Sequence, residues 1–492
     1  MQILRKSRLL RAFQLRGRTS PALMTAFVLV NGLVLVNAAL HDPRIGYDAR
    51  GYAAYVEVLS EGRLPGPRDS YEYLSPPLPF VLPATVRAAS RSFGVEAERG
   101  RWLAWKSGQL GNLLWSMLLT FFLLDLGRLL GPDLLHIRLT SLLFVGLLPV
   151  YQQSFAGMRA EPLVASLTVT TTWATLWALR GRTLRRYLVL GILLGLLALT
   201  RQWALAVVAG IGLVGLLHLA RAERRGAILR GGCLAGLLAF TVCGGFYWHL
   251  HDRYGSLAPH QQLGSVPDAR RANFSFRNQP RSFYLDMRAD KLFSDPVFPA
   301  LPNRLLPQLH STLWGDYWGF WVVAARDLRD GSYLHYLRAH RIIRQEGTQP
   351  AWLWTNRDRM GPYLGLVNAV SLLPSSLLLA SLAFGIVRSL RATAVRRPSL
   401  RTDLLRLATA VIVLSLASYG YFLLVTPDLL VGTTLKAMYQ LHVFPLWALL
   451  VAALLETLRG RSRWLYGLLL TGLAATFLWN ARMLITSYRE WW

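Results

Sequence analysis

Apolar blocks of about 20 residues recur along this chain, and they restrict its fold more than any other feature. A helix of that length crosses a hydrocarbon core roughly 30 Å thick. A soluble amphipathic helix would interrupt such a block with polar residues at nearly every turn. Only 16% of the residues are charged, against roughly 25% in an ordinary soluble domain. The pattern therefore predicts an all-α polytopic membrane protein.

About eleven apolar blocks are candidates for spans, by comparison with the length needed to cross a bilayer. They are residues 23–40, 102–126, 139–156, 163–179, 187–200, 203–220, 228–249, 363–387, 407–426, 436–458 and 464–484. The run Arg201-Gln202-Trp203 interrupts one long apolar stretch, so we expect two helices or a re-entrant pair at that point instead of a single crossing.

The net charge of +28 is concentrated in short basic segments between the apolar blocks. These segments are residues 1–19, 128–138, 180–186, 221–230, 388–406 and 459–463. Such segregation is the positive-inside pattern, which predicts a cytoplasmic N-terminus. We expect the membrane to be a bacterial-type inner or plasma membrane, with the active site on its outer side. The pattern also indicates that the basic residues contact the head groups of the membrane lipid bilayer and do not bind nucleic acid.

Two segments between predicted spans are too long to be simple connectors. We expect an N-terminal membrane module (1–249) with a catalytic first outer loop (41–101), an outer loop or small domain (250–362) and a C-terminal membrane module (363–492). Both outer segments should contain helices at the membrane surface. The aromatic stretch Ser311–Trp321 is predicted to anchor in the bilayer interface.

The first outer segment holds the most informative polar residues. Tyr52 and Tyr55 follow Asp48 at helical spacing, which places the three side chains on one stripe. A carboxylate beside aromatic rings at the membrane edge is well placed as a general base. Alternatively, Asp48 only caps the helix that follows. The double proline Pro76-Pro77 forces a rigid turn that would return Glu72 toward Asp48, unless Glu72 is simply solvated.

Three short motifs in this segment resemble the GT-C superfamily of membrane glycosyltransferases. The motifs are Tyr47-Asp48-x-x-x-Tyr52-x-x-Tyr55, Gly62-Arg63-Leu64-Pro65 and Pro76-Pro77-Leu78. The superfamily includes protein mannosyltransferases and the lipid A aminoarabinose transferase. The resemblance implies an inverting hexosyl or pentosyl transferase, which moves a sugar from a polyprenyl-phosphate carrier to an extracytoplasmic glycan, lipid or protein. It assigns the catalytic acid to Asp48.

The chain departs from that family pattern at two positions. Asp48-Ala49 stands where many members have adjacent acids, which leaves open whether a divalent cation such as Mg²⁺ or Mn²⁺ takes part. Asp42 and Asp48 are the acids that would bind it. Ser75 stands where many members have a basic residue, so another cation must meet the carrier phosphate.

Charged and aromatic residues at predicted outer helix ends complete the candidate site. Cations at membrane depth either bind a phosphate leaving group or snorkel to the head groups. For the carrier phosphate we expect Arg201, Lys436 and Arg159. For catalysis we expect Asp48 with Asp42 and Glu72. For substrate contacts we expect Tyr47, Tyr52, Tyr55, Glu161, Tyr439 and His442, the last two within the span 436–458. In the second outer segment, Asn303, Arg304 and Asp316 are weaker candidates for contacting an acceptor.

Two other classes of function remain open. A transporter or lipid flippase predicts ionisable groups in the middle of several spans and an internal repeat. The sequence instead places its charges at helix ends, and no repeat is evident. A non-catalytic protein of envelope assembly would leave the acids of the first outer segment unexplained.

Overall fold

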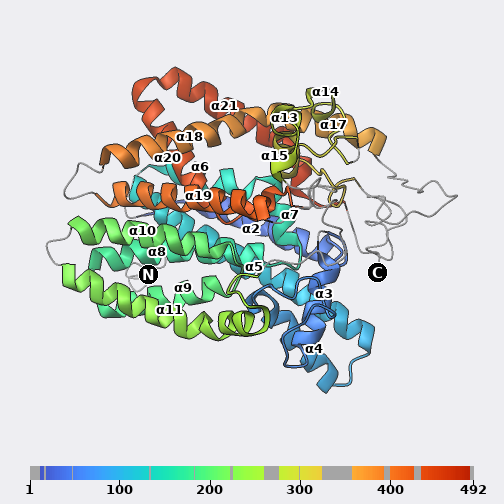
Figure 1. Ribbon diagram of the computed structural model, residues 1–492. Helices are drawn as coiled ribbons and strands as arrows, with labels where there is room; N and C mark the ends of the chain where they lie inside the picture. The colour runs from blue at the N-terminus through green and yellow to red at the C-terminus, as the bar shows by residue number, and fades with distance from the viewer. Residues whose placement is uncertain are drawn as a thin grey trace.

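The computed structural model describes residues 12–15, 18–46, 48–131, 134–181, 183–221, 225–259, 276–298, 300–323, 357–392, 399–425 and 434–487. These residues form a bundle of helices, most of them nearly parallel or antiparallel to one another (Figure 1). In the described ranges the only strands are β1 (Gln14–Leu15) and β2 (Arg18–Thr19), which pair antiparallel. The predicted all-α membrane fold is confirmed.

The helices follow the apolar blocks. The longer helices are α2 (Pro21–Leu40), α5 (Ala97–Leu130), α8 (Glu161–Gly181), α9 (Leu184–Ala198), α10 (Ala204–Arg221), α11 (Arg225–Tyr254), α18 (Leu372–Arg391), α19 (Leu400–Val425), α20 (Phe444–Arg461) and α21 (Arg463–Trp479). The shorter ones are α3 (Ala49–Leu59), α4 (Val81–Ser92), α6 (Leu135–Gly146), α7 (Pro149–Ala156), α13 (Arg281–Leu285), α14 (Ala289–Leu292), α15 (Leu305–Trp314) and α17 (Arg357–Val370). Single 3₁₀ turns are η2 (Leu78–Phe80), η3 (Phe276–Asn278), η6 (Ala437–Gln440) and η7 (Asn480–Leu484).

Six helices of the described chain are long and apolar enough to cross a membrane. The bent pair α6 and α7 adds a seventh if it is counted as one span. Large apolar side chains such as Leu216, Phe240 and Leu379 are each more than 60% exposed on the outside of the bundle. Only a hydrocarbon surrounding makes such surfaces favourable, so the chain is a multi-pass integral membrane protein. The expected count of about eleven crossings is not confirmed.

Two of the predicted spans are not single continuous helices, and proline explains both departures. The block 139–156 is bent by 57° between α6 and α7, because Pro149 begins a new helix instead of continuing the old one. The block 436–458 becomes α-helical only at Phe444, and Pro445 lies in the first turn of α20. Tyr439 and His442 therefore precede this helix and do not lie inside it.

The interruption predicted within 187–220 is confirmed, since α9 ends at Ala198 and α10 begins at Ala204.

Helix α9 packs closely on α11 through small residues. A Cβ atom at Gly191 would lie 2.6 Å from the carbonyl oxygen of Ala235, and Gly195 is equally close to Val242. Small residues of this kind let membrane helices approach each other backbone to backbone.

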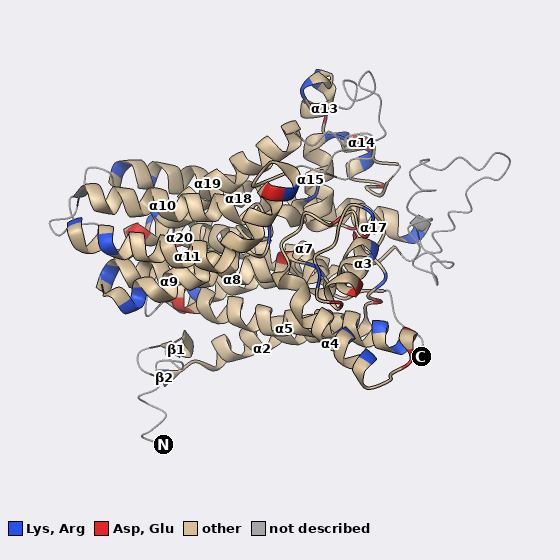
Figure 2. Cartoon of the chain, turned by 60° about the horizontal axis from the view of Figure 1, so that its bottom comes forward, with Lys and Arg blue, Asp and Glu red and all other residues tan. Residues whose placement is uncertain are grey.

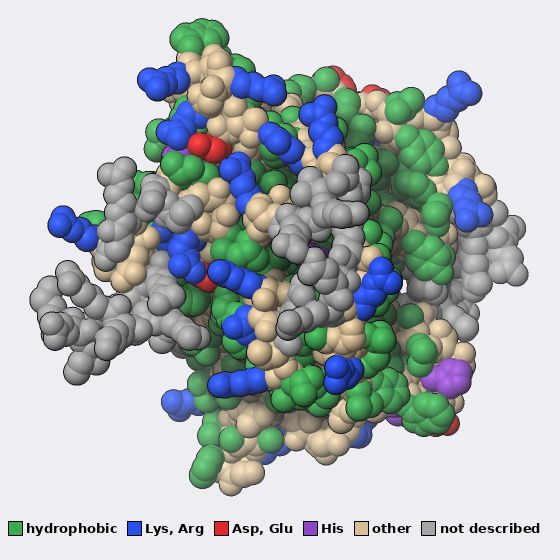
Figure 3. All heavy atoms as spheres, turned by 90° about the vertical axis from the view of Figure 1, so that its left-hand side faces the viewer, with side chains coloured by type: hydrophobic (Ala, Val, Ile, Leu, Met, Phe, Trp, Pro, Cys, Tyr) green, Lys and Arg blue, Asp and Glu red, His purple; other side chains and the backbone are tan. Residues whose placement is uncertain are grey.

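The two ends of the bundle differ in charge. Figure 2 shows Lys and Arg gathered at helix ends, with few charges along the middle of the helices. The end viewed in Figure 3 carries many basic side chains and few acids, and we call it the basic end. The opposite end carries α3 and α4, which come from the first outer segment, and we call it the site end.

The aromatic stretch near Trp321 does not form the expected interfacial anchor. Trp314, Tyr317 and Trp321 are 0%, 1% and 2% exposed, so they pack inside the protein. Asp316 draws this loop inward, because its carboxylate accepts hydrogen bonds from the backbone N–H groups of residues 320, 321, 322 and 323. This buried role leaves the Asp316 carboxylate no free oxygen for the acceptor contact that the sequence suggested.

Candidate active site at the site end

The first outer segment begins at the carboxyl end of α2, where α5 holds the backbone. Lys106 Nζ donates to the carbonyl oxygens of Ala38, Ala39 and His41 at 2.8–3.2 Å. These carbonyls have no partner within the helix, so the buried ammonium group satisfies them. The entry of the chain into the site is therefore fixed by a lysine that the sequence analysis did not select.

The same face of α5 also fixes a second loop. Gln109 donates to the carbonyl oxygens of His41 and Ala156, at 3.1 and 2.7 Å. One turn further on, Asn112 donates to the carbonyl oxygens of Phe155 and Gly157, at 2.9 and 2.7 Å. Residues 106, 109 and 112 thus hold the loop that leads to Asp48 and the loop that carries Arg159. Their spacing of three is the only sequence signal of this role.

The backbone at Asp48 is left-handed, with φ of 60° and ψ of 7°. A non-glycine residue in this region carries a cost on the order of 1 kcal/mol, which Asp tolerates better than most. The side chain of Asp48 makes no capping hydrogen bond to α3, so the alternative of a simple helix cap is not supported. Gly46, at φ of 125°, makes the approach to this turn possible, whereas Tyr47 lies outside the described residues.

The carboxylate of Asp48 faces an ammonium group from the far part of the sequence. Lys436 Nζ lies 3.4 Å from Asp48 Oδ2, and the two side chains are 3% and 21% exposed. Burial is the main cause that lowers the pKa of Lys436; the charge of Asp48 opposes this, and the charge of Arg159 adds to it. The pair combines a partly accessible carboxylate with a buried cation that has a second cation beside it.

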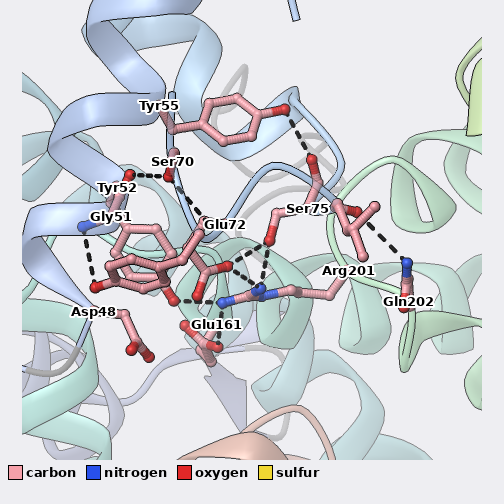
Figure 4. Close-up of polar contacts among 12 residues, drawn as sticks. Asp48, Gly51, Tyr52, Tyr55, Ser70, Glu72, Ser75, Glu161, Arg201 and Gln202 are labelled. Carbon is pink, nitrogen blue, oxygen red and sulfur yellow. Dashed lines mark hydrogen bonds and ion pairs between the residues drawn. The ribbon is translucent and has the colours of Figure 1, made fainter. Parts of the chain in front are cut away.

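Arg201 forms the centre of a second polar group (Figure 4). Its Nη1 donates to Glu72 Oε2 at 2.9 Å and to Ser75 Oγ at 2.7 Å. Its Nη2 donates to the Tyr52 hydroxyl and to Glu161 Oε1 at 3.3 Å. The rigid turn before Pro76 has therefore returned Glu72 into the protein, and the guanidinium occupies the place beside Ser75. We call Tyr52, Glu72, Ser75, Glu161 and Arg201 the arginine cluster.

The arginine cluster holds two carboxyl groups and one guanidinium, and the net effect of its surroundings is to raise the pKa of Glu72. Burial raises the pKa of Glu72, Arg201 lowers it, and the charge of Asp48 raises it again. The influence of Asp48 indicates that the two carboxylates are near neighbours, as Figure 4 also shows. Glu161 Oε2 is buried without a hydrogen-bond partner. Two carboxylates thus compensate one guanidinium, which leaves little of the charge of Arg201 for an added anion.

A cavity opens beside the Asp48–Lys436 pair. It is open to the outside, and its wall includes Lys436 and Arg159. Arg159 Nη1 contacts Met438 Sδ at 3.0 Å, and a Cβ atom at Gly46 would lie 3.5 Å from Arg159 Nη2. Two cations therefore share one wall of a cavity at the site end.

Not every predicted residue joins this site. The carboxylate of Asp42 binds its neighbour Arg44 through both oxygens, at 2.5–3.2 Å. Burial would raise the pKa of Asp42, but the hydrogen bonds and charge of Arg44 outweigh it and hold the pKa below its usual range. His442 Nε2 bonds to Ser415 Oγ of α19 at 3.0 Å. Asp42 and His442 are therefore engaged in local contacts.

The aromatic candidates support the site mainly by packing. Tyr55 donates its hydroxyl to the carbonyl oxygen of Ser75 at 2.8 Å, and its ring lies 4.6 Å from that of Phe80. The Tyr439 ring lies 5.1 Å from that of Trp203 and 5.3 Å from Lys436 Nζ. Tyr439 therefore contacts both Trp203 and Lys436, from a 3₁₀ turn that precedes α20.

The acids expected to bind a divalent cation do not form a metal site. In the described part of the chain, no group of three or more His, Cys, Asp or Glu side chains is arranged to hold a metal ion. Asp42 binds Arg44, and Asp48 contacts Lys436. Because each carboxylate already faces a cation, this pair of acids does not fit Mg²⁺ or Mn²⁺.

The fold and the buried charged site define a polytopic all-α membrane protein with a polar cavity at one end. No family model matches the chain, and no curated protein sequence matches it. Over 95% of its length it is similar in structure to an oligosaccharyltransferase from Archaeoglobus fulgidus, solved with Zn and sulfate, with a TM-score of 0.47 and 14% identity. The match covers 54% of the archaeal chain, so the present chain spans about half the length of that protein.

A second group of solved structures is similar over a smaller share of the chain. ArnT from Cupriavidus metallidurans, bound to undecaprenyl phosphate, has a TM-score of 0.33 and 15% identity. That match covers 88% of this chain and 78% of ArnT.

Proposed function

We propose that this protein is a glycosyltransferase that moves a sugar from a polyprenyl-phosphate carrier to an acceptor at the site end. The observation that carries the proposal is the Asp48–Lys436 contact of 3.4 Å beside a cavity that Arg159 also lines. In the proposed reaction Asp48 is the general base, and the two cations beside it suit a phosphate leaving group. The motifs around Asp48 that resemble GT-C enzymes support the same reaction.

Lys436 and Arg159 are the residues that we assign to the carrier phosphate. Arg159 disfavours the charged form of Lys436, so the two cations repel each other. A phosphate between them would relieve that repulsion through charge-assisted hydrogen bonds to both side chains. Arg201, whose charge Glu72 and Glu161 already compensate, instead positions the arginine cluster.

The reaction that we infer is a single displacement. The carboxylate of Asp48 accepts the proton of an acceptor hydroxyl, and the hydroxyl oxygen forms a bond to the anomeric carbon of the sugar. The bond between that carbon and the phosphate oxygen breaks at the same time, and polyprenyl phosphate leaves with the electron pair. Attack opposite the leaving group inverts the anomeric centre. The phosphate also competes with Asp48 for Lys436, which frees the carboxylate to act as a base.

The orientation in the membrane follows from the charge difference between the two ends. Basic helix ends favour the cytoplasm, so we place the basic end inside and the site end outside. Donor and acceptor would then meet on the extracytoplasmic face of a bacterial-type inner membrane. The long outer segment 250–362 is the part of the chain to which we assign acceptor recognition.

The proposal is tested by the release of polyprenyl phosphate from polyprenyl-phosphate sugars by the purified full-length protein. We expect Asp48→Asn to lower turnover by about 10²–10⁴-fold, the usual contribution of a general base, without loss of folded protein. Asp69→Asn is the matched control, because Asp69 binds the exposed Arg63 in the same outer segment. Normal turnover by Asp48→Asn would remove Asp48 from the mechanism, and carrier binding without any release would favour a flippase.

A further inference from the structure

The turn that returns Glu72 into the protein also carries Tyr71, whose hydroxyl reaches the start of α3. We propose that Tyr71 is a positioning residue that keeps the carboxylate of Asp48 from capping this helix. Its hydroxyl occupies the backbone N–H of Gly51, which leaves Asp48 directed at Lys436. The inference rests on the proposed function, because it concerns how the general base of that reaction is held in place.

Asp48 holds the position from which a carboxylate usually caps a helix. It directly precedes α3, and its carbonyl oxygen accepts the first helical hydrogen bond, from the N–H of Tyr52 at 3.0 Å. An Asp in this position usually accepts a second bond through its side chain, from the N–H two or three residues on. Those residues are Arg50 and Gly51. The Asp48 side chain makes no such bond, and Figure 4 shows it directed away from Gly51.

Tyr71 takes the N–H group that the cap would have used. The N–H of Gly51 donates to the Tyr71 hydroxyl at 3.1 Å. The two residues fit closely, since a Cβ atom at residue 51 would lie 2.5 Å from the Tyr71 ring and 2.9 Å from its hydroxyl oxygen. Only glycine permits this approach. The group that would attract the Asp48 carboxylate therefore already has a partner.

The neighbours of Tyr71 fix its position. Ser70 is 6% exposed, and its hydroxyl donates to the carbonyl oxygen of Gly51 at 2.8 Å and accepts from the N–H of Glu72 at 3.0 Å. The carboxylate of Glu72 in turn accepts from Arg201 at 2.9 Å. The turn is thus tied to α3 on one side and to the arginine cluster on the other, so buried contacts determine where the Tyr71 hydroxyl lies.

Without this hydroxyl, two effects would draw the carboxylate of Asp48 toward α3. An unsatisfied N–H group at the start of a helix favours a negatively charged cap. A capping residue also has an extended backbone, so the strain of the left-handed conformation at Asp48 would be relieved. Both effects favour a conformer in which the carboxylate has left Lys436. The Tyr71 hydroxyl removes the first effect and so favours the conformer that the reaction needs.

The kinetic test is Tyr71→Phe, which removes the hydroxyl and keeps the ring. We expect kcat for polyprenyl phosphate release by the full-length protein to fall about tenfold, the usual weight of one capping bond together with relief of strain. KM for the donor should stay within about threefold, because the two cations of the cavity wall are unchanged. Gly51→Ala displaces the same hydroxyl from the other side and should give the same split between kcat and KM.

Tyr363→Phe is the matched control for the loss of a hydroxyl. The Tyr363 hydroxyl also bonds to one backbone group, the carbonyl oxygen of Trp479, outside the arginine cluster and the cavity wall. Both kinetic constants should be unchanged in this variant. An equal fall of kcat in Tyr363→Phe and Tyr71→Phe would reduce the role of Tyr71 to general support of the fold and overturn the inference.

Amide hydrogen exchange tests the cap itself and does not depend on turnover. The amide of Gly51 should stay protected in Tyr71→Phe, because Asp48 takes over the bond, and in Asp48→Ala, because Tyr71 keeps it. Only the double variant should lose protection, by about tenfold. Loss of protection in Tyr71→Phe alone, or retained protection in the double variant, would contradict the competition between the two side chains.

The two measurements separate the inference from the proposed function. If Tyr71→Phe releases polyprenyl phosphate at the normal rate and Asp48→Asn does not, the role of Tyr71 fails and the proposed function stands. If the unchanged protein releases none from any donor, the proposed function fails, and the exchange pattern alone decides whether Tyr71 keeps Asp48 from capping α3.

Discussion

The two ends of the bundle use charged residues in opposite ways. At the basic end, Glu456 accepts hydrogen bonds from His136 at 2.5 Å and from Arg459 at 2.9 and 3.1 Å. At the site end, Asp48 makes one ionic contact of 3.4 Å with Lys436, on a left-handed backbone beside a cavity. The first carboxylate is saturated by partners that join α6 to α20. The second is held but not saturated, as the exchange of its partner in the proposed reaction requires.

The two ends also differ in how far solvent reaches their charged side chains. Arg459 has a side chain that is 40% exposed, so its ion pair is screened by solvent and contributes little. Lys436 has a side chain that is 3% exposed, so its charge is costly unless an anion faces it. We therefore expect the basic end to tolerate loss of a charge and the site end to depend on each of its cations.

The largest expected difference is between Lys436→Met and Arg459→Met. We expect Lys436→Met to lower kcat/KM for a polyprenyl-phosphate donor by about 10²–10³-fold, the usual effect of removing one group that stabilises a developing negative charge. Arg459→Met should leave kcat/KM within about twofold, because exposed ion pairs contribute at most about 1 kcal/mol. Initial rates of carrier release measure both, and similar losses in the two variants would erase the distinction between the ends.

A second difference concerns stability. Glu72→Ala removes one of the two carboxylates that compensate the buried Arg201, and we expect a loss of about 3 kcal/mol. Glu61→Ala, in the same outer segment, removes an exposed partner of Arg63 and should cost less than about 1 kcal/mol. Denaturant unfolding in detergent compares the two variants. Equal stability would show that Glu161 alone compensates Arg201.

The pH dependence of carrier binding is a smaller effect. Burial lowers the pKa of Lys436 below 10.5, so the folded protein loses this proton at a lower pH than a free lysine would. Phosphate binding needs the ammonium form, and affinity should fall as pH rises through the lowered pKa. In Lys436→Arg the guanidinium stays charged, so the alkaline loss should shift to higher pH. Undecaprenyl phosphate titrations at several pH values measure the shift, and identical profiles would assign the alkaline loss to another group.

The smallest expected effect is that of Asp42→Asn. The carboxylate of Asp42 binds Arg44, whose side chain is 44% exposed, and does not contact the arginine cluster or Lys436. We expect turnover within about threefold of the unchanged protein, since an exposed ion pair contributes little. A loss as large as that of Asp48→Asn would restore Asp42 to the catalytic group.

The sequence predicted the local parts of this comparison well. Apolar blocks located the helices, and the interruption at Arg201 correctly separated α9 from α10. The double proline indicated the turn that returns Glu72. Pro149 and Pro445 also carried a signal for the breaks in these two predicted spans, because proline favours the first turn of a helix and disfavours its interior.

The pairing of distant residues was not predictable in the same way. Lys436 and Asp48 are 388 positions apart, and their contact depends on how the C-terminal helices pack against the first outer segment. The same limit applies to Asp316, whose neighbours suggested an exposed aromatic anchor until its carboxylate was seen to gather four backbone N–H groups. The hydropathy of a segment indicates how much apolar surface it has, but not whether protein or lipid packs against that surface.

The polar face of α5 has a consequence for movement within the site. Gln109 donates hydrogen bonds to the backbone of both the Asp48 loop and the Arg159 loop, so helix α5 fixes the position of the two loops relative to each other. Lys436 reaches the site from the segment just before α20, which this face of α5 does not hold. We therefore expect a substrate that enters between Asp48 and Lys436 to shift the later segment relative to α5, while the two earlier loops keep their mutual spacing.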